Sequence, residues 1–252
     1  MALLELKNVS VHFAGLTALS GVTFDVVPGQ VCAVIGPNGA GKSTLFNAIT
    51  GYVAPSQGSV RFDGRNIAGR APHIIAASGV RRTFQNGGVF GDMTVLENVL
   101  TGLNQQTDSH PIGLLVNLGR SVIAEKEAVQ KAHSLLELMG LSDHANRVTA
   151  DLSSGQQRIV EITRALAAHT RLLLLDEPAV GLAASERDHL MTVLRSLAED
   201  GIAILLVEHV IDLVMAVSDR IVVLNQGEVI ASGTPEEIRS HDAVIEAYLG
   251  YH

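Results

Sequence analysis

Short runs of alternating apolar and polar residues fill the first 30 positions of the chain. Val22, Phe24 and Val26 alternate with polar neighbours, and glycines interrupt the runs at Gly15 and Gly21. Alternation with a period of two is typical of strands that bury one face, and glycines between such runs favour turns. The pattern therefore predicts antiparallel strands and turns at the start of the chain.

Further along, short unbroken apolar runs alternate with segments of helical periodicity. The run Val31–Ile35 enters a glycine-rich turn and then a helical stretch that ends near Gly51. Later runs at 172–175, 202–207 and 221–224 each follow a helical segment. Continuous apolar runs of this length are typical of parallel strands that are buried on both faces. We predict an α/β fold whose sheet is mainly parallel.

The middle of the chain has a different texture. Glycines and a polar stretch at 105–111 break it, and apolar residues at helical spacing then fill 121–140. We predict a single domain in which 86–150 forms an inserted, mostly α-helical subdomain. The remaining ranges, 1–85 and 151–252, are expected to form the α/β core together with its N-terminal β subdomain.

Composition excludes several classes of protein. The 252 residues are 47% hydrophobic and 17% charged, which allows a sizeable core. A net charge of −8 argues against a nucleic-acid partner, since such proteins need a basic surface. One cysteine excludes an intrachain disulfide and fits a reducing compartment. We find neither a signal peptide nor an apolar span of about 20 residues, so we expect a cytoplasmic protein that does not cross a membrane.

The glycine-rich turn after the first buried strand carries the strongest chemical signal. It fits the pattern G-x-x-x-x-G-K followed by Ser or Thr, between a strand and a helix. Backbone N–H groups of such a loop converge on phosphate oxygens, while the lysine contacts the β and γ phosphates and the hydroxyl contacts Mg²⁺. We predict an ATP-type triphosphate site made of Gly36, Pro37, Asn38, Gly39, Ala40, Gly41, Lys42, Ser43 and Thr44.

Two carboxylates follow the apolar run at 172–175. Asp176 suits Mg²⁺ bound through water, and Glu177 suits polarising an attacking water molecule, because phosphoryl transfer mainly needs positioning and charge stabilisation. The alternative interpretation is an ordinary strand end followed by an acidic helix cap. After a phosphate loop, we favour the catalytic interpretation.

The segment Leu152-Ser-Ser-Gly-Gln-Gln157 is close to LSGGQ and precedes a predicted helix. With this segment and its phosphate loop, the chain resembles the ATP-binding subunits of ABC transporters. The other motifs of that family follow in order along the chain. Gln85, in Arg82-Thr-Phe-Gln85, matches the glutamine loop, His209 matches the switch histidine, and Phe13 matches the aromatic residue that stacks on adenine.

The resemblance implies a head-to-tail dimer in which each ATP lies between one phosphate loop and the partner's signature. Glu177 and His209 are then catalytic, and Gln85 joins Ser43 at the Mg²⁺ that accompanies ATP. Taken alone, His209 is also compatible with a surface histidine at a strand end. The signature residues are equally compatible with a plain helix N-cap. In the dimer they bind the partner's ATP, and they are Ser153, Ser154, Gly155 and Gln156.

Two positions depart from the family pattern. Ser154 replaces the first glycine of LSGGQ, which exchanges one small residue for another. Ala183 stands where the family usually has Asp or Asn, the residue that bridges the two active sites. Alanine cannot form a polar bridge, and the resemblance implies that this subunit pairs with a related second ATPase, so we expect a heterodimer.

Shorter runs resemble the branched-chain amino acid importers in particular. They include 93–98, 207–209 and the tail 247–250, and the long stretch 102–121 resembles the larger of that importer's two ATPase subunits. The resemblance implies a peripheral protein on the cytoplasmic face of the inner (plasma) membrane. Its expected partners are two transmembrane permease subunits, the second ATPase subunit and, indirectly, a periplasmic binding protein.

Alternative functions remain open from the sequence. Importers of urea, amides or aromatic acids and the lipopolysaccharide exporter have similar ATPases. A non-transport ABC ATPase is the alternative of a different class. It is disfavoured because the chain has one phosphate loop, no long heptad run and a net negative charge.

A glycine-rich loop after Gln85 carries the apolar side chains Val89, Phe90 and Met93. A solvated loop would not favour three such residues. The resemblance implies that they line a groove for a short cytoplasmic helix of the permease. The alternative is that they complete the core of the helical subdomain.

Overall fold

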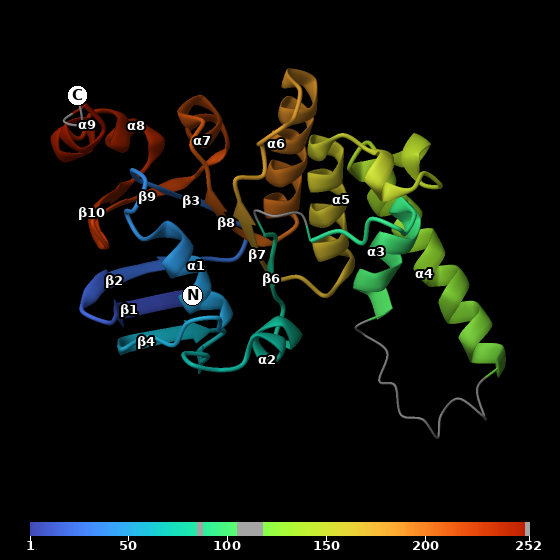
Figure 1. The fold of residues 1–252 in the computed structure, drawn as a ribbon, viewed down its shortest axis with the longest axis horizontal. Coiled ribbons are helices and arrows are strands. Elements are labelled where there is room, and N and C mark those ends of the chain that lie inside the picture. Colours follow the sequence, from blue (N-terminus) through green and yellow to red (C-terminus); the bar gives the residue numbers. More distant parts are fainter. Residues whose placement is uncertain (85–87, 105–117, 250–252) are drawn as a thin grey trace. The chain divides into compact units, whose positions relative to one another are not determined.

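The computed structural model describes residues 1–84, 88–104 and 118–249. The chain forms two compact units, coloured along the sequence in Figure 1. The first unit comprises Met1–Arg82, Arg171–Glu177 and Leu194–His252. The second comprises Thr83–Thr170 and Pro178–Val193.

An antiparallel sheet opens the first unit and confirms the strands expected at the N-terminus. Its order is β2-β1-β4-β5, and each neighbouring pair runs antiparallel. Asp63 and Gly64, both with positive φ, turn the chain from β4 into β5. The strands are β1 (Leu4–Phe13), β2 (Leu16–Val26), β4 (Gln57–Phe62) and β5 (Arg65–Asn66).

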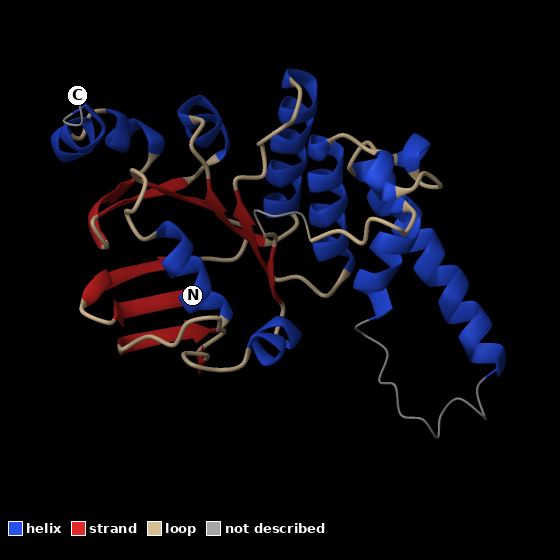
Figure 2. Ribbon diagram, viewed as in Figure 1, coloured by secondary structure: helices blue, strands red, loops and turns tan. Residues whose placement is uncertain are grey.

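A second sheet of the first unit has the order β10-β9-β3-β8-β7-β6. All its neighbours are parallel except β9 and β10, so the expected mainly parallel sheet is confirmed (Figure 2). Every residue of β3, β7 and β8 is buried, as continuous apolar runs require. The strands are β3 (Val31–Ile35), β6 (Val80–Arg82), β7 (Leu172–Asp176), β8 (Ala203–Val207), β9 (Arg220–Asn225) and β10 (Glu228–Gly233).

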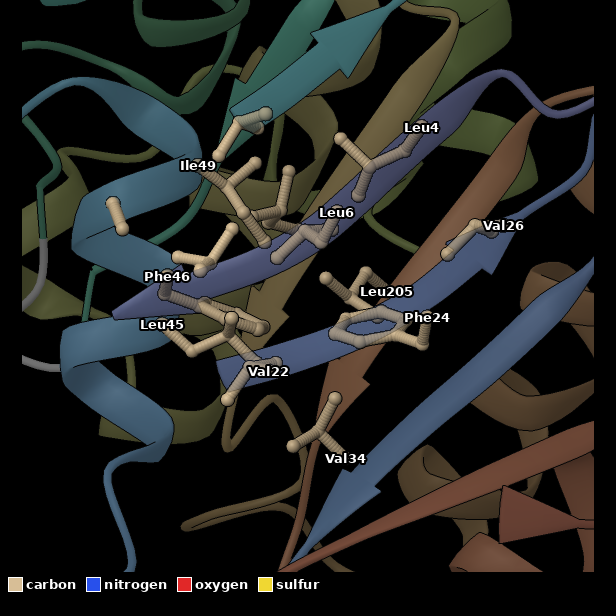
Figure 3. Close-up of a cluster of buried hydrophobic side chains, with 14 of the residues drawn as sticks. Leu4, Leu6, Val22, Phe24, Val26, Val34, Leu45, Phe46, Ile49 and Leu205 are labelled. Atoms are coloured by element: carbon tan, nitrogen blue, oxygen red, sulfur yellow. The ribbon is translucent and has the colours of Figure 1, made fainter. Parts of the chain in front are cut away.

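The main core of the first unit gathers around α1 (Lys42–Thr50). Leu45, Phe46 and Ile49 point from this helix toward strand residues such as Leu6 and Leu205 (Figure 3). Each is fully buried. Burying one such side chain contributes about 1.5–3 kcal/mol. This packing fixes the start of α1, and therefore the phosphate loop, relative to the sheet.

Short helices complete the first unit. Thr234 and Glu237 form a capping box at the start of α8. Ile238 of that helix is buried against the β9 side of the sheet together with Val244. The helices are α2 (Pro72–Ala77), α7 (Ile211–Val217), α8 (Pro235–Arg239) and α9 (Asp242–Leu249).

The second unit is mainly helical. Its helices α3 and α5 approach closely, since a Cβ on Gly102 would lie 2.3 Å from the carbonyl oxygen of Arg164. Buried Asn98 donates hydrogen bonds to Phe90 O and Thr149 Oγ1, at 2.9 Å each. The elements are α3 (Val95–Asn104), α4 (Leu118–Leu138), α5 (Ser154–Ala167), the 3-10 turns Ser142–His144 and Thr149–Asp151, and the beginning of α6 (Ala184–Glu199).

This compact unit extends beyond the range 86–150 in which we expected the helical subdomain. It begins at Thr83 and also contains α5 and 178–193. The division of the chain at 86 and 150 therefore stays a prediction. Within the part of the chain that the structure describes, no helix is long and apolar enough to span a membrane.

Candidate active site

The phosphate loop joins β3 to α1 and approaches two other backbone segments closely. A Cβ on Gly36 would lie 2.1 Å from the carbonyl oxygen of Leu224. A Cβ on Gly41 would lie 2.7 Å from that of Ala18, and Gly41 also has a φ of +103°. Only glycine fits these two positions, since any side chain would displace the neighbouring backbone. The sequence pattern therefore has a steric cause as well as a chemical one.

Lys42 begins α1 and turns back toward the loop. Its Nζ donates hydrogen bonds of 2.7 Å to Gly36 O and 3.0 Å to Pro37 O, and the residue is buried. Burial lowers the pKa of the amine, while the negative charges of Glu177 and Asp176 oppose that shift. Two carbonyl groups of the loop thus hold the lysine ammonium, which also interacts electrostatically with both strand-end carboxylates.

The remaining loop residues differ in exposure. Asn38, Gly39 and Ser43 are exposed, Pro37 and Thr44 are half-buried, and Ala40 is buried. The exposed hydroxyl of Ser43 lies in the first turn of α1, where unpaired backbone N–H groups of a helix favour anions. The loop therefore offers N–H donors, an ammonium and a hydroxyl oxygen, which fits a triphosphate carrying Mg²⁺.

Asp176 is the last residue of β7 and is buried against an arginine. Its Oδ2 lies 3.1 Å from Arg82 Nη2, and both side chains are less than a tenth exposed. Arg82 also donates a 2.6 Å hydrogen bond to Asn47 Oδ1 and packs its guanidinium over the Phe46 ring. The neighbouring strands β6 and β7 thus bring together an ion pair that ties Asp176 to the outer face of α1.

Glu177 and His209 meet at the same edge of the sheet. Glu177 Oε1 lies 2.9 Å from His209 Nε2, and Glu177 N donates a 2.8 Å hydrogen bond to Val207 O. Glu177 has a φ of +51°, a left-handed conformation that costs on the order of 1 kcal/mol for a residue with a side chain. The backbone bond to Val207 helps to hold this conformation.

The signature residues lie in the second unit, at the start of α5. Ser153 accepts a 3.1 Å hydrogen bond from Gln156 N, and Gln156 Oε1 accepts a 3.3 Å bond from Ser153 N. A Cβ on Gly155 would lie 2.5 Å from the carbonyl oxygen of Gly181. Ser153 is thus the N-cap of α5, and Gly155 lies close to the backbone of Gly181. Ser154 is the first residue of α5 and is exposed.

Gln85 lies outside the described residues, but the structure describes the residue before it. The N–H of Phe84 donates a 2.7 Å hydrogen bond to Glu161 Oε1, and the carbonyl of Phe84 accepts from Arg158 Nη1. Arg158 and Glu161 are both buried and form an ion pair of 3.3 Å on α5. The helix that begins with the signature therefore holds the chain where it enters the glutamine loop.

Two other predicted residues are exposed. Phe13 ends β1 with a fractional exposure of 45%, and the ring is available to a ligand. Phe90 is 50% exposed and its ring lies 5.2 Å from the guanidinium carbon of Arg164, while Met93 is 38% exposed and Val89 is half-buried. Phe90 and Met93 are therefore not buried core residues.

Sequence reasoning missed three polar residues that organise these sites. Arg82 pairs with Asp176, and Arg158 and Glu161 bind the backbone of Phe84. A spacing of three residues places Arg158 and Glu161 on one face of a helix, but it does not report what they contact. The pairing of Arg82 with Asp176 depends on which strands are neighbours, and no local pattern reports that.

The first unit therefore combines a phosphate loop with strand-end carboxylates and a histidine on a mainly parallel sheet, which defines a phosphate-loop ATPase. Comparison with known proteins places it more narrowly. The model of the ABC transporter family matches residues 19–180, and that of the branched-chain amino acid ATP-binding cassette transporters matches residues 228–252. The chain belongs to the ABC transporter family, as an ATP-binding subunit.

Curated relatives match the chain over its whole length. The high-affinity branched-chain amino acid transport ATP-binding protein BraF of Pseudomonas aeruginosa is 43% identical over 249 residues, which cover 98% of each chain. The corresponding protein LivG of Escherichia coli is 41% identical over 251 residues, again 98% of each. A crystal structure of the ADP conformation of an ABC transporter cassette has a TM-score of 0.85 at 35% identity and covers 99% of both chains.

Proposed function

We propose that this chain binds and hydrolyses ATP to drive the import of branched-chain amino acids. The observation that carries the substrate class is the full-length similarity to BraF and LivG, together with the family match at residues 228–252. Similarity of this extent includes both the insertion and the tail. The arrangement of the first unit supports the hydrolytic part of the proposal.

In this proposal the ATP phosphates bind in the loop 36–44, and Phe13 stacks on the adenine. Lys42 places its charge near the β and γ phosphates, and the first turn of α1 contributes backbone N–H donors. Mg²⁺ bound with ATP would neutralise phosphate charge, with Ser43 and Gln85 supplying oxygen atoms to hold it and Asp176 acting on it through water.

Glu177 orients the attacking water in this mechanism. Its carboxylate is partly exposed and lies beside the His209 ring, so a water molecule can reach it. A carboxylate only accepts hydrogen bonds, so the ring nitrogen that faces it donates. His209 thereby fixes the direction of the Glu177 carboxylate and remains close to the expected γ-phosphate. Both residues act by positioning, which is the main contribution that proteins make to phosphoryl transfer.

The signature residues complete a second ATP site on a partner ATPase. Ser153, Gly155 and the start of α5 provide a hydroxyl, a small residue and helix N–H groups for the γ-phosphate of that site. Ala183 offers no polar group to bridge the two sites, and its N–H already donates a 2.8 Å bond to Glu186. A heterodimer on two permease subunits at the cytoplasmic face of the membrane is the assembly we propose, supplied by a periplasmic binding protein.

Uptake in cells tests the substrate class. The gene is disrupted in its organism of origin and complemented with the wild-type chain or with Glu177→Gln. We expect uptake of labelled leucine, isoleucine and valine to fall on disruption and to return only with the wild type. Loss of urea or aromatic-acid uptake, with branched-chain uptake unchanged, would overturn the assignment of substrate while leaving the ATPase assignment intact.

A further inference from the structure

A buried carboxylate at the end of β8 is not used by the mechanism above. Glu208 lies between Val207, the last residue of β8, and His209. It is only 2% exposed, although carboxylates are almost never fully buried unless they are bound to other groups. Such a residue next to a catalytic histidine needs a physical explanation.

The carboxylate of Glu208 binds the backbone that carries the histidine. Its Oε2 accepts a 2.9 Å hydrogen bond from His209 N and a 3.3 Å bond from Val210 N. Val210 is the N-cap of α7 and has no side-chain oxygen to accept from the helix that follows. Glu208 does not cap the helix, because it accepts from residues 209 and 210 rather than from the first turn of α7, but it fixes two consecutive peptide groups just before that helix.

These bonds matter because the His209 side chain is only partly packed. It is 46% exposed, so hydrogen bonds contribute to its direction. Two contacts involve His209 directly: its ring nitrogen lies 2.9 Å from Glu177 Oε1, and its backbone N–H donates a hydrogen bond to Glu208. The backbone of Glu177 is in turn bonded to Val207, one residue before Glu208. Residues 207–209 therefore bind Glu177 through both its backbone and its side chain.

We propose that Glu208 is a positioning residue for hydrolysis. It accepts hydrogen bonds from the N–H groups of residues 209 and 210 and thereby orients the His209 imidazole toward Glu177. This inference rests on the proposed function of His209. The requirement is for an oxygen acceptor of the right reach. Both N–H groups bind the same oxygen, Oε2 of Glu208.

Three variants of the assembled transporter test this requirement. Glu208→Gln keeps an amide oxygen at the same reach and is expected to hydrolyse ATP within about threefold of the wild type, since it replaces one acceptor by another. Glu208→Leu has a similar volume and no acceptor. Its kcat should fall by about 10–100-fold with the KM for ATP unchanged, because small misplacements of a catalytic group have effects of that size. Glu199→Leu removes an exposed carboxylate at the end of α6 and serves as the control.

Nitrogen NMR of histidine-labelled full-length chain gives a readout that does not depend on turnover. The His209 ring signals, assigned by their absence from His209→Ala, should shift in Glu208→Leu and stay in place in Glu208→Gln. If Glu208→Gln loses as much hydrolysis as Glu208→Leu, or if the ring signals are the same in all variants, the positioning role is wrong. If Glu208→Leu fails to fold, Glu208→Gln is compared with the wild type alone, and a loss of hydrolysis well beyond about threefold overturns the positioning role.

The same series separates this inference from the proposed function. If His209→Ala hydrolyses ATP normally, the role of His209 is wrong and the role of Glu208 falls with it. If His209→Ala is impaired while Glu208→Leu hydrolyses like the wild type, only the positioning role of Glu208 is overturned.

Discussion

Glu177 Oε1 and His209 Nε2 lie 2.9 Å apart, although 32 positions separate the two residues in the sequence. Strand pairing explains the contact. β7 and β8 are parallel neighbours in which Asp176 is paired with Val207, so the residues that follow them emerge at the same edge of the sheet. Parallel sheets bind ligands at the carboxyl ends of their strands for this reason. The pair is therefore a product of register between two buried strands.

The first prediction concerns this pair. Glu177→Gln keeps an oxygen atom opposite His209 but loses the charge that polarises water. We expect ATP binding to be retained and hydrolysis by the assembled transporter to fall by about 10²–10⁴-fold, the usual contribution of a general base. Turnover is measured by phosphate release and binding by calorimetry. Near-normal turnover by this variant would show that another group orients the water.

The second prediction concerns the phosphate loop. Lys42→Ala removes a charge that is held by two loop carbonyls, and charge-assisted bonds contribute about 1.5–3 kcal/mol each. The affinity for ATP should fall by roughly 10–100-fold, since about 1.4 kcal/mol corresponds to a factor of ten. Lys7→Ala is the matched control, because Lys7 is an exposed lysine that pairs with Glu5. Calorimetry that finds equal affinity for both variants would exclude the proposed role of Lys42.

Local patterns were sufficient to predict most of the fold and the phosphate loop. The alternating strands, the buried run Val31–Ile35 and the helix after it all follow from periodicity and from glycines at fixed spacing. Contacts between distant segments could not be predicted in this way. Arg82 binds Asp176 only because β6 and β7 are neighbours, and the sequence around Arg82 indicated a glutamine loop and gave no sign of an ion pair.

The third prediction tests that ion pair. Arg82→Met removes the guanidinium and so breaks its buried ion pair with Asp176. Breaking one side of a buried pair destabilises proteins by about 3–5 kcal/mol, so the midpoint of urea unfolding should fall clearly. Arg195→Met breaks an exposed pair with Asp219 and should cost less than about 1 kcal/mol. Equal losses for the two variants would contradict the structural role of Arg82.

The fourth prediction concerns Cys32, which is fully buried in β3 as expected for a small core residue. Burial raises the pKa of its thiol from 9.0 to about 12. The thiol is therefore protonated and inaccessible in the folded chain, and only the unfolded chain should react with a thiol reagent at pH 8. Labelling measured along a urea titration should follow unfolding, and rapid labelling without urea would be inconsistent with a buried Cys32.

The raised pKa also has a consequence for stability. Between pH 9.0 and about 12 the unfolded thiol is ionised while the folded thiol keeps its proton. The unfolded state then binds fewer protons, so the free energy of unfolding falls as pH rises through this window. Cys32→Ala lacks this group and should show a shallower loss of stability over the same range, measured by urea unfolding.

The last prediction concerns the exposed apolar loop and the permease. Phe90 and Met93 are 50% and 38% exposed, so replacing either with arginine does not disrupt a buried core. Phe90→Arg brings a positive charge beside Arg164, which already packs over the Phe90 ring, so Met93→Arg serves as a second variant of the same loop. If this loop receives a permease helix, both variants should lose transport and co-purification with the permease while ATP affinity of the isolated subunit stays unchanged.

The exposed residue Lys126 provides a control for this prediction, since Lys126→Arg changes a side chain on α4 and should leave transport intact. Transport at the wild-type rate in Met93→Arg would mean that the loop does not form the docking surface, and loss in Phe90→Arg alone would point to repulsion from Arg164 as its cause.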